Sequence, residues 1–173
     1  MKARETAMNL TVQSDYAFRT MMYLAVRHPA AATVQEISAH YGISRAHLMV
    51  LVNRLGSRGL LLNTRGRGGG IRLARPNSDI RLNEILLATE PGFDLAECFR
   101  GKSNQCLITR PCRLRRVLDE ALESFLAVLA KYTLADMVRS NPPLVRLLTM
   151  PSRSSASTPA RPSSRSVSRR RSA

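Results

Sequence analysis

Apolar side chains recur at helical spacing near the start of the chain. From Ser14 onward they follow one another at intervals of three and four residues, which predicts a helix with one buried face made of Ala17, Phe18, Met21, Met22 and Ala25. Ser14 is expected to be the N-cap of this helix, because serine oxygens accept hydrogen bonds from the first free N–H groups. The helix is expected to end near His28-Pro29.

Two further helices are predicted directly after the first, with a glycine between them. The second covers residues 33–41, and Gly42 ends it because glycine tolerates the left-handed conformation. Ser44 can cap the third, which ends near Gly59 and whose core positions recur at i, i+3, i+4 and i+7, namely Leu48, Leu51, Val52 and Leu55. Two short helices joined by a glycine turn are typical of a helix-turn-helix.

Two short extended runs come next, residues 60–64 and 71–74, with a basic glycine-rich segment between them. This pattern predicts a β-hairpin, and three helices followed by a basic hairpin predict a winged helix-turn-helix. A fourth helix is expected over residues 81–90, where Pro91-Gly92 ends it. The predicted DNA-binding domain therefore spans residues 8–90.

The second half of the chain is organised differently. Residues 91–111 show no clear period and are expected to form a loop that is ordered by what it binds. From Cys112 a long helix is predicted, with one apolar seam at alternating spacings of four and three residues that consists of Leu114, Leu118, Ala121, Phe125, Val128 and Tyr132. Such a seam needs a partner, and a second copy of the helix fits better than the body of the same subunit.

The predicted fold class is therefore mainly α with a small β-wing: a winged helix-turn-helix domain plus a long dimerisation helix. Residues 112–148 would form the dimerisation helix and a C-terminal segment. Residues 149–173 are rich in serine and arginine, hold almost no large apolar side chain and are expected to be disordered, because they cannot form a core.

The charge of the chain is strongly positive, at +15. Residues 1–80 carry eleven basic and four acidic side chains, and residues 151–173 carry six basic side chains and no acidic one. Such a field attracts polyanions, either nucleic acid or an anionic membrane surface. The chain has neither a long apolar run nor a secretory signal, so we expect a cytoplasmic protein without a membrane partner.

The third helix and the hairpin carry the candidate DNA contacts. With its core positions inside, this helix exposes a small polar face around Asn53, which fits a major groove; an ordinary solvated helix face is the alternative. The hairpin arginines suit a minor groove, although a flexible basic loop would have the same composition. The residues expected to contact double-stranded DNA are Ser44, Arg45, His47, Met49, Asn53, Arg54, Arg65 and Arg67.

All three cysteines of the chain, Cys98, Cys106 and Cys112, fall within fifteen residues. In a reducing compartment such a group indicates ligands before disulfides, whereas three small core residues would be the alternative. Thiolates favour zinc or an iron-sulfur cluster, and each needs a fourth ligand here. We find no nucleophile elbow, HExxH motif or Walker loop, so the sequence does not indicate an enzyme.

Several stretches resemble the family of winged-helix iron-sulfur repressors that includes IscR and RirA, and in particular its nitric-oxide-sensitive members. The resemblance covers residues 8–148 and rests on MNLTVQSDYAFR at 8–19, YGISRAHL at 41–48, RGRGGGIRLARP at 65–76, CLITRPCRLRRVL at 106–118 and YTLADMV at 132–138. The cysteine pattern together with YTLAD is the most specific of these features.

The resemblance implies a homodimer in which each subunit holds one iron-sulfur cluster, of the 2Fe-2S or 4Fe-4S type. The ligands would be Cys98, Cys106, Cys112 and, from the other subunit, Asp15. The cluster-loaded form would bind operators and repress genes of nitric oxide detoxification, until nitric oxide attacks the cluster. Two alternatives remain: a regulator of the same scaffold that senses iron or redox state, and a zinc-stabilised nucleic-acid-binding module.

Overall fold

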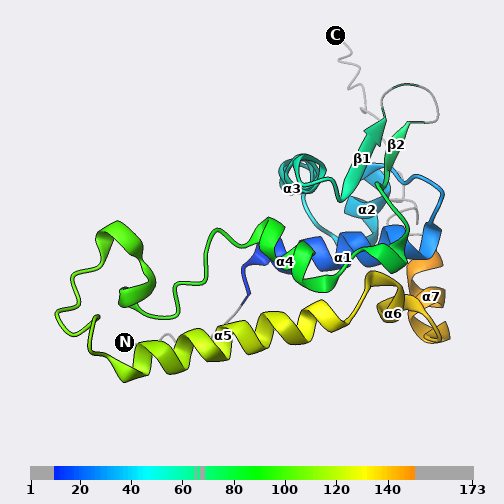
Figure 1. Ribbon diagram of the computed structural model, residues 1–173. Coiled ribbons are helices and arrows are strands. Elements are labelled where there is room, and N and C mark those ends of the chain that lie inside the picture. The colour runs from blue at the N-terminus through cyan, green and yellow to red at the C-terminus, as the bar shows by residue number, and fades with distance from the viewer. Residues whose placement is uncertain (1–9, 65, 67–68, 151–173) are drawn as a thin grey trace, which may run out of the picture.

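The computed structural model describes residues 10–64, 66 and 69–150 of the 173 in the chain. Arg65, Arg67 and the serine- and arginine-rich tail from residue 151 onward lie outside the described residues. The structure is mainly helical with one two-stranded sheet (Figure 1), as predicted. Its elements are α1 (Val12–Arg27), α2 (Val34–Tyr41), α3 (Arg45–Ser57), β1 (Leu61–Thr64), β2 (Gly70–Leu73), α4 (Leu82–Thr89), α5 (Arg113–Lys131), α6 (Leu134–Val138) and α7 (Pro142–Thr149).

Helix α1 begins earlier than the sequence indicates, and the prediction that Ser14 is its N-cap is wrong. Thr11 is the N-cap, and its Oγ1 accepts a hydrogen bond from the backbone N–H of Ser14 at 3.3 Å. Ser14 is fully buried in the first turn. Its hydroxyl donates to Glu90 Oε1 at 2.5 Å and is hydrogen-bonded to the Thr89 hydroxyl at 2.8 Å. These partners are remote in sequence, so a local pattern cannot reveal them.

Helices α2 and α3 form the predicted helix-turn-helix. Thr33 and Glu36 make a capping box at the start of α2, in which each side chain accepts a hydrogen bond from the backbone N–H of the other. Gly42 ends α2 with a φ of 67°, a conformation that glycine adopts without steric cost. Ser44 caps α3 as predicted: its Oγ accepts from the His47 N–H at 3.2 Å.

Strands β1 and β2 pair antiparallel, with Leu61 opposite Leu73. The second strand of this hairpin is also fixed, near its loop end, to the connection between α1 and α2. Ala32 donates its N–H to the Ile71 carbonyl at 2.9 Å, and Ile71 donates back to the Ala32 carbonyl at 2.7 Å. A Cβ on Gly70 would lie 2.8 Å from the Ala32 carbonyl oxygen, so only glycine allows this close approach. The wing is thus built into the domain.

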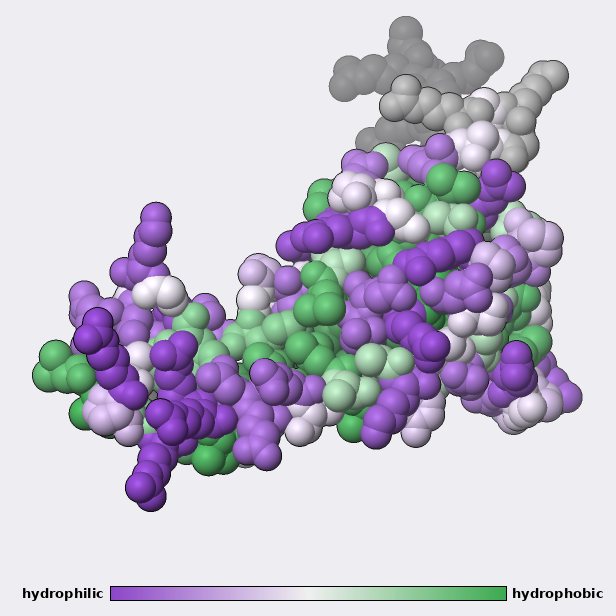
Figure 2. All heavy atoms as spheres, viewed as in Figure 1, coloured by the Kyte–Doolittle hydropathy of each residue, from purple (hydrophilic) through white to green (hydrophobic). Residues whose placement is uncertain are grey.

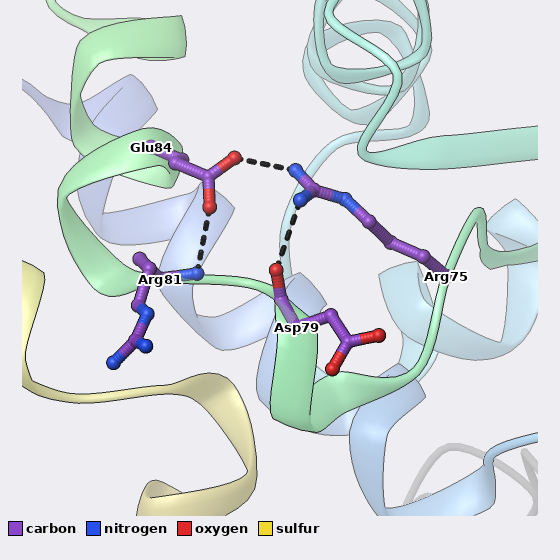
Figure 3. Close-up of polar contacts among 4 residues, drawn as sticks. All are labelled: Arg75, Asp79, Arg81 and Glu84. Atoms are coloured by element: carbon purple, nitrogen blue, oxygen red, sulfur yellow. Dashed lines mark hydrogen bonds and ion pairs between the residues drawn. The ribbon is translucent and has the colours of Figure 1, made fainter.

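An arginine-centred contact joins the end of the wing to α4 (Figure 3). The Arg75 guanidinium donates to the Asp79 carbonyl at 2.9 Å and forms an ion pair with Glu84. The Glu84 carboxylate also accepts from the Arg81 N–H at 2.9 Å. Burial alone would raise the pKa of Glu84, but these two hydrogen-bond donors and their positive charge lower it. The connection between wing and α4 is therefore tightly held.

Helix α5 passes beneath the winged helix and extends beyond it (Figure 1). The segment from residue 91 to 112, which we call the cysteine loop, lies at the far N-terminal end of α5. After α5 the chain returns to the winged helix, where Leu134 and Leu148 join its core. Figure 2 shows hydrophobic residues exposed at the far end of this extension. Within the described part of the chain, no helix is both long and apolar enough to cross a membrane.

Candidate DNA-binding surface and cysteine loop

Helix α3 places its predicted core residues inside and its predicted contact residues outside. The four core positions, Leu48, Leu51, Val52 and Leu55, are all at most 2% exposed. Ser44, Arg45, His47, Met49 and Asn53 are exposed on the other sides of α3 and at its cap. The helix therefore has a free polar face of the size that fits a major groove.

Arg54 differs from the other candidates on α3, because it is half-buried and already has a partner. Its Nη1 donates to Gln13 Oε1 of α1 at 2.6 Å. Gln13 was not among the candidates from sequence. This contact joins α3 to the first turn of α1, so a movement of that turn would change the orientation of α3.

The hairpin lies directly after α3 and presents Asn63 and Arg72 to solvent. Its predicted DNA contacts, Arg65 and Arg67, lie outside the described residues. The position of the hairpin beside α3 (Figure 1) is that of a wing in a winged helix.

The cysteine loop is irregular, but its residues make hydrogen bonds with one another. Two short 3-10 turns, Glu97–Phe99 and Gly101–Ser103, occur where the sequence predicted only a loop. The Cys106 N–H donates to Asn104 Oδ1 at 3.0 Å, and the Thr109 hydroxyl donates to the Cys106 carbonyl at 2.7 Å. The loop thus has local order of its own.

The three cysteines are free and half-buried. Cys98 lies in the first 3-10 turn, Cys106 begins the turn held by Thr109, and Cys112 is the residue that precedes the first turn of α5. In the described part of the chain, no three histidine, cysteine or acidic side chains are grouped closely enough to hold a metal ion. Three thiols on one short loop are the right donors for iron or zinc, but they would have to move together to bind it.

Asp15 lies in the first turn of α1, whereas the cysteine loop of the same chain lies at the far N-terminal end of α5 (Figure 1). Its carboxylate is about half exposed and forms a bidentate ion pair with Arg19, with N–O distances of 2.9 and 2.7 Å. This is an i, i+4 pair on the helix surface, where such contacts contribute little stability. Asp15 is therefore accessible to a second molecule.

A polar network that the sequence analysis did not find joins α1 to the start of the cysteine loop. Glu90, at the C-terminal end of α4, accepts hydrogen bonds on Oε1 from the Thr11 N–H at 2.9 Å, the Thr11 hydroxyl at 3.1 Å and the Ser14 hydroxyl at 2.5 Å. The cysteine loop starts at the next residue. A displacement of that loop would therefore act directly on the N-terminal end of α1.

Comparison with known proteins decides the family. The model of the Rrf2 family, described as iron-dependent transcriptional regulators, matches residues 10–140. The chain belongs to the Rrf2 family. The resemblance inferred from the sequence motifs is thereby confirmed.

Among the relatives of this Rrf2 protein are HTH-type transcriptional regulators named NsrR. The one from Bacillus subtilis is 42% identical over 83% of this chain and 99% of its own length. The one from Geobacillus kaustophilus is 41% identical over 82% of this chain and 97% of its own. These are transcriptional regulators, and we conclude that the present chain is a DNA-binding regulator and not an enzyme.

Solved structures with the same fold include two regulators of low sequence identity. The oxidized form of Staphylococcus aureus CymR gives a TM-score of 0.62 at 20% identity, covering 76% of this chain and 97% of that one. IscR of T. potens gives 0.59 at 24% identity, covering 77% of this chain and 88% of that one. They establish the winged-helix fold of the Rrf2 protein.

Proposed function

We propose that this Rrf2 regulator is a repressor whose operator binding depends on an iron-sulfur cluster and is abolished by nitric oxide. The observation that carries the proposal is that all three cysteines lie, free and half-buried, on the one loop that connects the winged helix to α5. Relatives that this chain matches over nearly their whole length are named NsrR. The genes controlled would be those of nitric oxide detoxification, and the protein would act in the cytoplasm.

The domains follow from this assignment. Residues 8–90 form the DNA-binding domain, residues 91–111 the cluster-binding loop, residues 112–148 the dimerisation helix and C-terminal segment, and residues 149–173 a cationic tail. In the structure Thr149 is still the last residue of α7, so the tail begins after it. On this division α6 and α7 belong with the dimerisation segment in sequence, although they pack on the winged-helix core. That packing gives the dimer helix a firm attachment to the DNA-binding domain.

Dimerisation would use the predicted apolar seam of α5. The body of the subunit contacts a neighbouring stripe of the helix, through Leu129. Three large seam residues are open to solvent: Leu114 is 63% exposed, and Val128 and Tyr132 are each 48% exposed. The other two, Leu118 and Phe125, are half-buried. Apolar residues in a continuous stripe indicate a helix partner, and we assign a second copy of the chain to it.

The ligands would be Cys98, Cys106 and Cys112 of one subunit and Asp15 of the other. The cluster, of the 2Fe-2S or 4Fe-4S type, would supply iron that reacts with nitric oxide. The positive end of α5 and the guanidinium groups of Arg113 and Arg116 favour negative charge beside Cys112. A movement of the cysteine loop would shift Glu90 and, through its hydrogen bonds to Thr11, the start of α1. The hydrogen bond between Gln13 and Arg54 would then carry this movement to α3.

Substitution of the cysteines tests the cofactor. Each of Cys98→Ala, Cys106→Ala and Cys112→Ala should lose the iron and sulfide that the unaltered protein retains when purified without air, because a cluster cannot be held by two thiolates on this loop. Lys102→Ala, an exposed residue of the same loop, is the matched control and should keep both. Elemental analysis for iron, sulfide and zinc is the measurement. Zinc without sulfide would establish the zinc-stabilised alternative instead.

A second candidate function is supported by the description of the Rrf2 family as iron-dependent. In that case the same scaffold and the same cysteines would report iron supply or redox state. Operator binding would then follow the iron content of the medium, and nitric oxide would have no separate effect.

The DNA contacts of α3 are tested by base preference. Asn53 is exposed at the centre of the polar face, where an asparagine can bind adenine through two hydrogen bonds worth about 1–3 kcal/mol of discrimination. Asn53→Ala should therefore reduce the preference for operator over single-base variants by roughly tenfold. Asn63→Ala, which removes the same side chain from the hairpin, should leave that preference unchanged. Competition binding against a set of point-mutated operators measures both, and an unaltered profile for Asn53→Ala would exclude its groove contact.

A further inference from the structure

An apolar groove lies between the first turn of α1 and the side of α3. It has a volume of about 390 Å³ and is lined by Val12, Gln13, Tyr16, His47, Val50 and Leu51. Val12 and Val50 are 62% and 58% exposed at its rim. Of the residues that line the groove, His47 is also a predicted DNA contact. Exposed apolar surface of this shape indicates a partner with apolar side chains.

The same chain exposes an apolar pair that matches the groove in chemistry. Leu107 is 99% exposed and Ile108 is 61% exposed, and they follow one another directly after Cys106 in the cysteine loop. The Thr109 hydroxyl holds their turn by donating to the Cys106 carbonyl at 2.7 Å. We call these two residues the apolar tip. Both aliphatic side chains stand in water, which is unfavourable unless something covers them.

The apolar tip is remote from the groove of its own subunit. The cysteine loop lies beyond the N-terminal end of α5, whereas α1 and α3 lie in the winged helix on the other side (Figure 1). Helix α5 has 19 residues, which corresponds to about 28 Å at roughly 1.5 Å per residue. A second copy is therefore the occupant that the geometry favours.

The seam of α5 has the symmetry that such a second copy needs. Its residues fall into three pairs with one common midpoint at Glu123: Leu114 with Tyr132, Leu118 with Val128, and Ala121 with Phe125. In a two-fold antiparallel pair of helices, each of these residues meets its counterpart. A parallel pair would instead bring together the arginines at the N-terminal ends of both helices and would align their dipoles. Antiparallel pairing places the cysteine loop of one copy beside the winged helix of the other.

We propose that the apolar tip, Leu107 and Ile108, of one subunit inserts into the α1–α3 groove of the second subunit. This inference rests on the homodimer of the proposed function and adds a contact that is independent of the cluster ligands. It connects the cysteine loop directly to α3, because Val50 and Leu51 line the groove. Withdrawal of the tip would free the side of α3 that lines the groove.

A photo-cross-linking amino acid at position 107 of the full chain tests the contact. Isotopically heavy and light copies are mixed, allowed to exchange and irradiated, so that mass spectrometry distinguishes links between copies from links within one. We expect heavy–light links from position 107 to peptides that contain Val12 to Tyr16 or His47 to Leu51. The same photo-cross-linker at Leu87, an exposed apolar residue of α4, is the control and should not reach those peptides.

A substitution at the rim of the groove tests whether the cross-link depends on insertion of the apolar tip. Val12→Asp places a charge at the rim and should lower the heavy–light cross-link yield from position 107 at least tenfold, while sedimentation still shows a dimer. Links within one chain, links only to α5, or an unchanged yield in Val12→Asp would overturn the proposal and leave the homodimer standing. A monomer in sedimentation would overturn both. If the protein is a dimer but the cross-link forms only after a bound small apolar compound has been removed, that compound and not the tip would be the occupant of the groove.

Discussion

Nitric oxide added without air to the cluster-loaded protein should lower its operator affinity in step with the loss of cluster absorbance. The expected decrease is about 5- to 150-fold, the range that a typical coupling free energy of roughly 1–3 kcal/mol produces. The physical reason is that the cysteine loop begins at the residue after Glu90, whose carboxylate holds Thr11 and Ser14 of α1. Titration of one sample, with absorbance and operator binding recorded together, is the measurement.

The cysteine variants supply the control for this titration. Cys106→Ala should already bind operator weakly before nitric oxide is added, and nitric oxide should not change its affinity further. Far-ultraviolet circular dichroism should remain that of a folded protein, because the winged-helix core contains none of the cysteines. Full operator binding after complete loss of the cluster would contradict the proposed mechanism and would favour another signal.

Two adjacent leucines of α4 should differ greatly in their contribution to stability. Leu86 is fully buried, and Leu87 is 48% exposed. Leu86→Ala should lower the free energy of unfolding by about 2–5 kcal/mol, because it removes apolar contacts and leaves a cavity. Leu87→Ala, which makes the same chemical change on the neighbouring position, should cost well under 1 kcal/mol, since exposed positions contribute little.

Urea denaturation of both α4 variants at one protein concentration measures this difference. The concentration must be fixed because the stability of the proposed dimer would depend on it. Similar losses for the two variants would mean that Leu87 is covered in the assembled protein, and equal stability for all three proteins would contradict the packing of α4 against the core.

The helices and the hairpin could be predicted from the sequence because their determinants are local. The core of α3 repeats at helical spacing, Ser44 caps it from the position next to its first residue, and Gly42 supplies the left-handed residue that ends α2. Each of these signals acts within one or two turns. The structure bears them out for the same reason.

The start of α1 was predicted wrongly because the role of the Ser14 hydroxyl depends on remote residues, although the actual N-cap, Thr11, acts locally. Ser14 has the residue type of an N-cap, but its hydroxyl is used by Thr89 and Glu90, more than seventy residues later in the chain. The contact between Arg54 and Gln13 likewise joins residues that are 41 positions apart. Spacing along the sequence contains no information on such pairs. The cysteine cluster shows the same limit, because proximity in sequence predicted the ligands but not their separation in space.

The attachment of the wing limits how this regulator can respond to any signal. Two backbone hydrogen bonds join Ile71 to Ala32, and Gly70 approaches the Ala32 carbonyl too closely for any other residue. The wing therefore cannot swing relative to the connection between α1 and α2 without breaking these two hydrogen bonds. The wing and the α1–α2 connection would therefore meet DNA as one unit. In the proposed homodimer, a signal that moves the cysteine loop would then change the spacing and tilt between two such units, and operator binding would depend on the spacing of the two half-sites as well as on their bases.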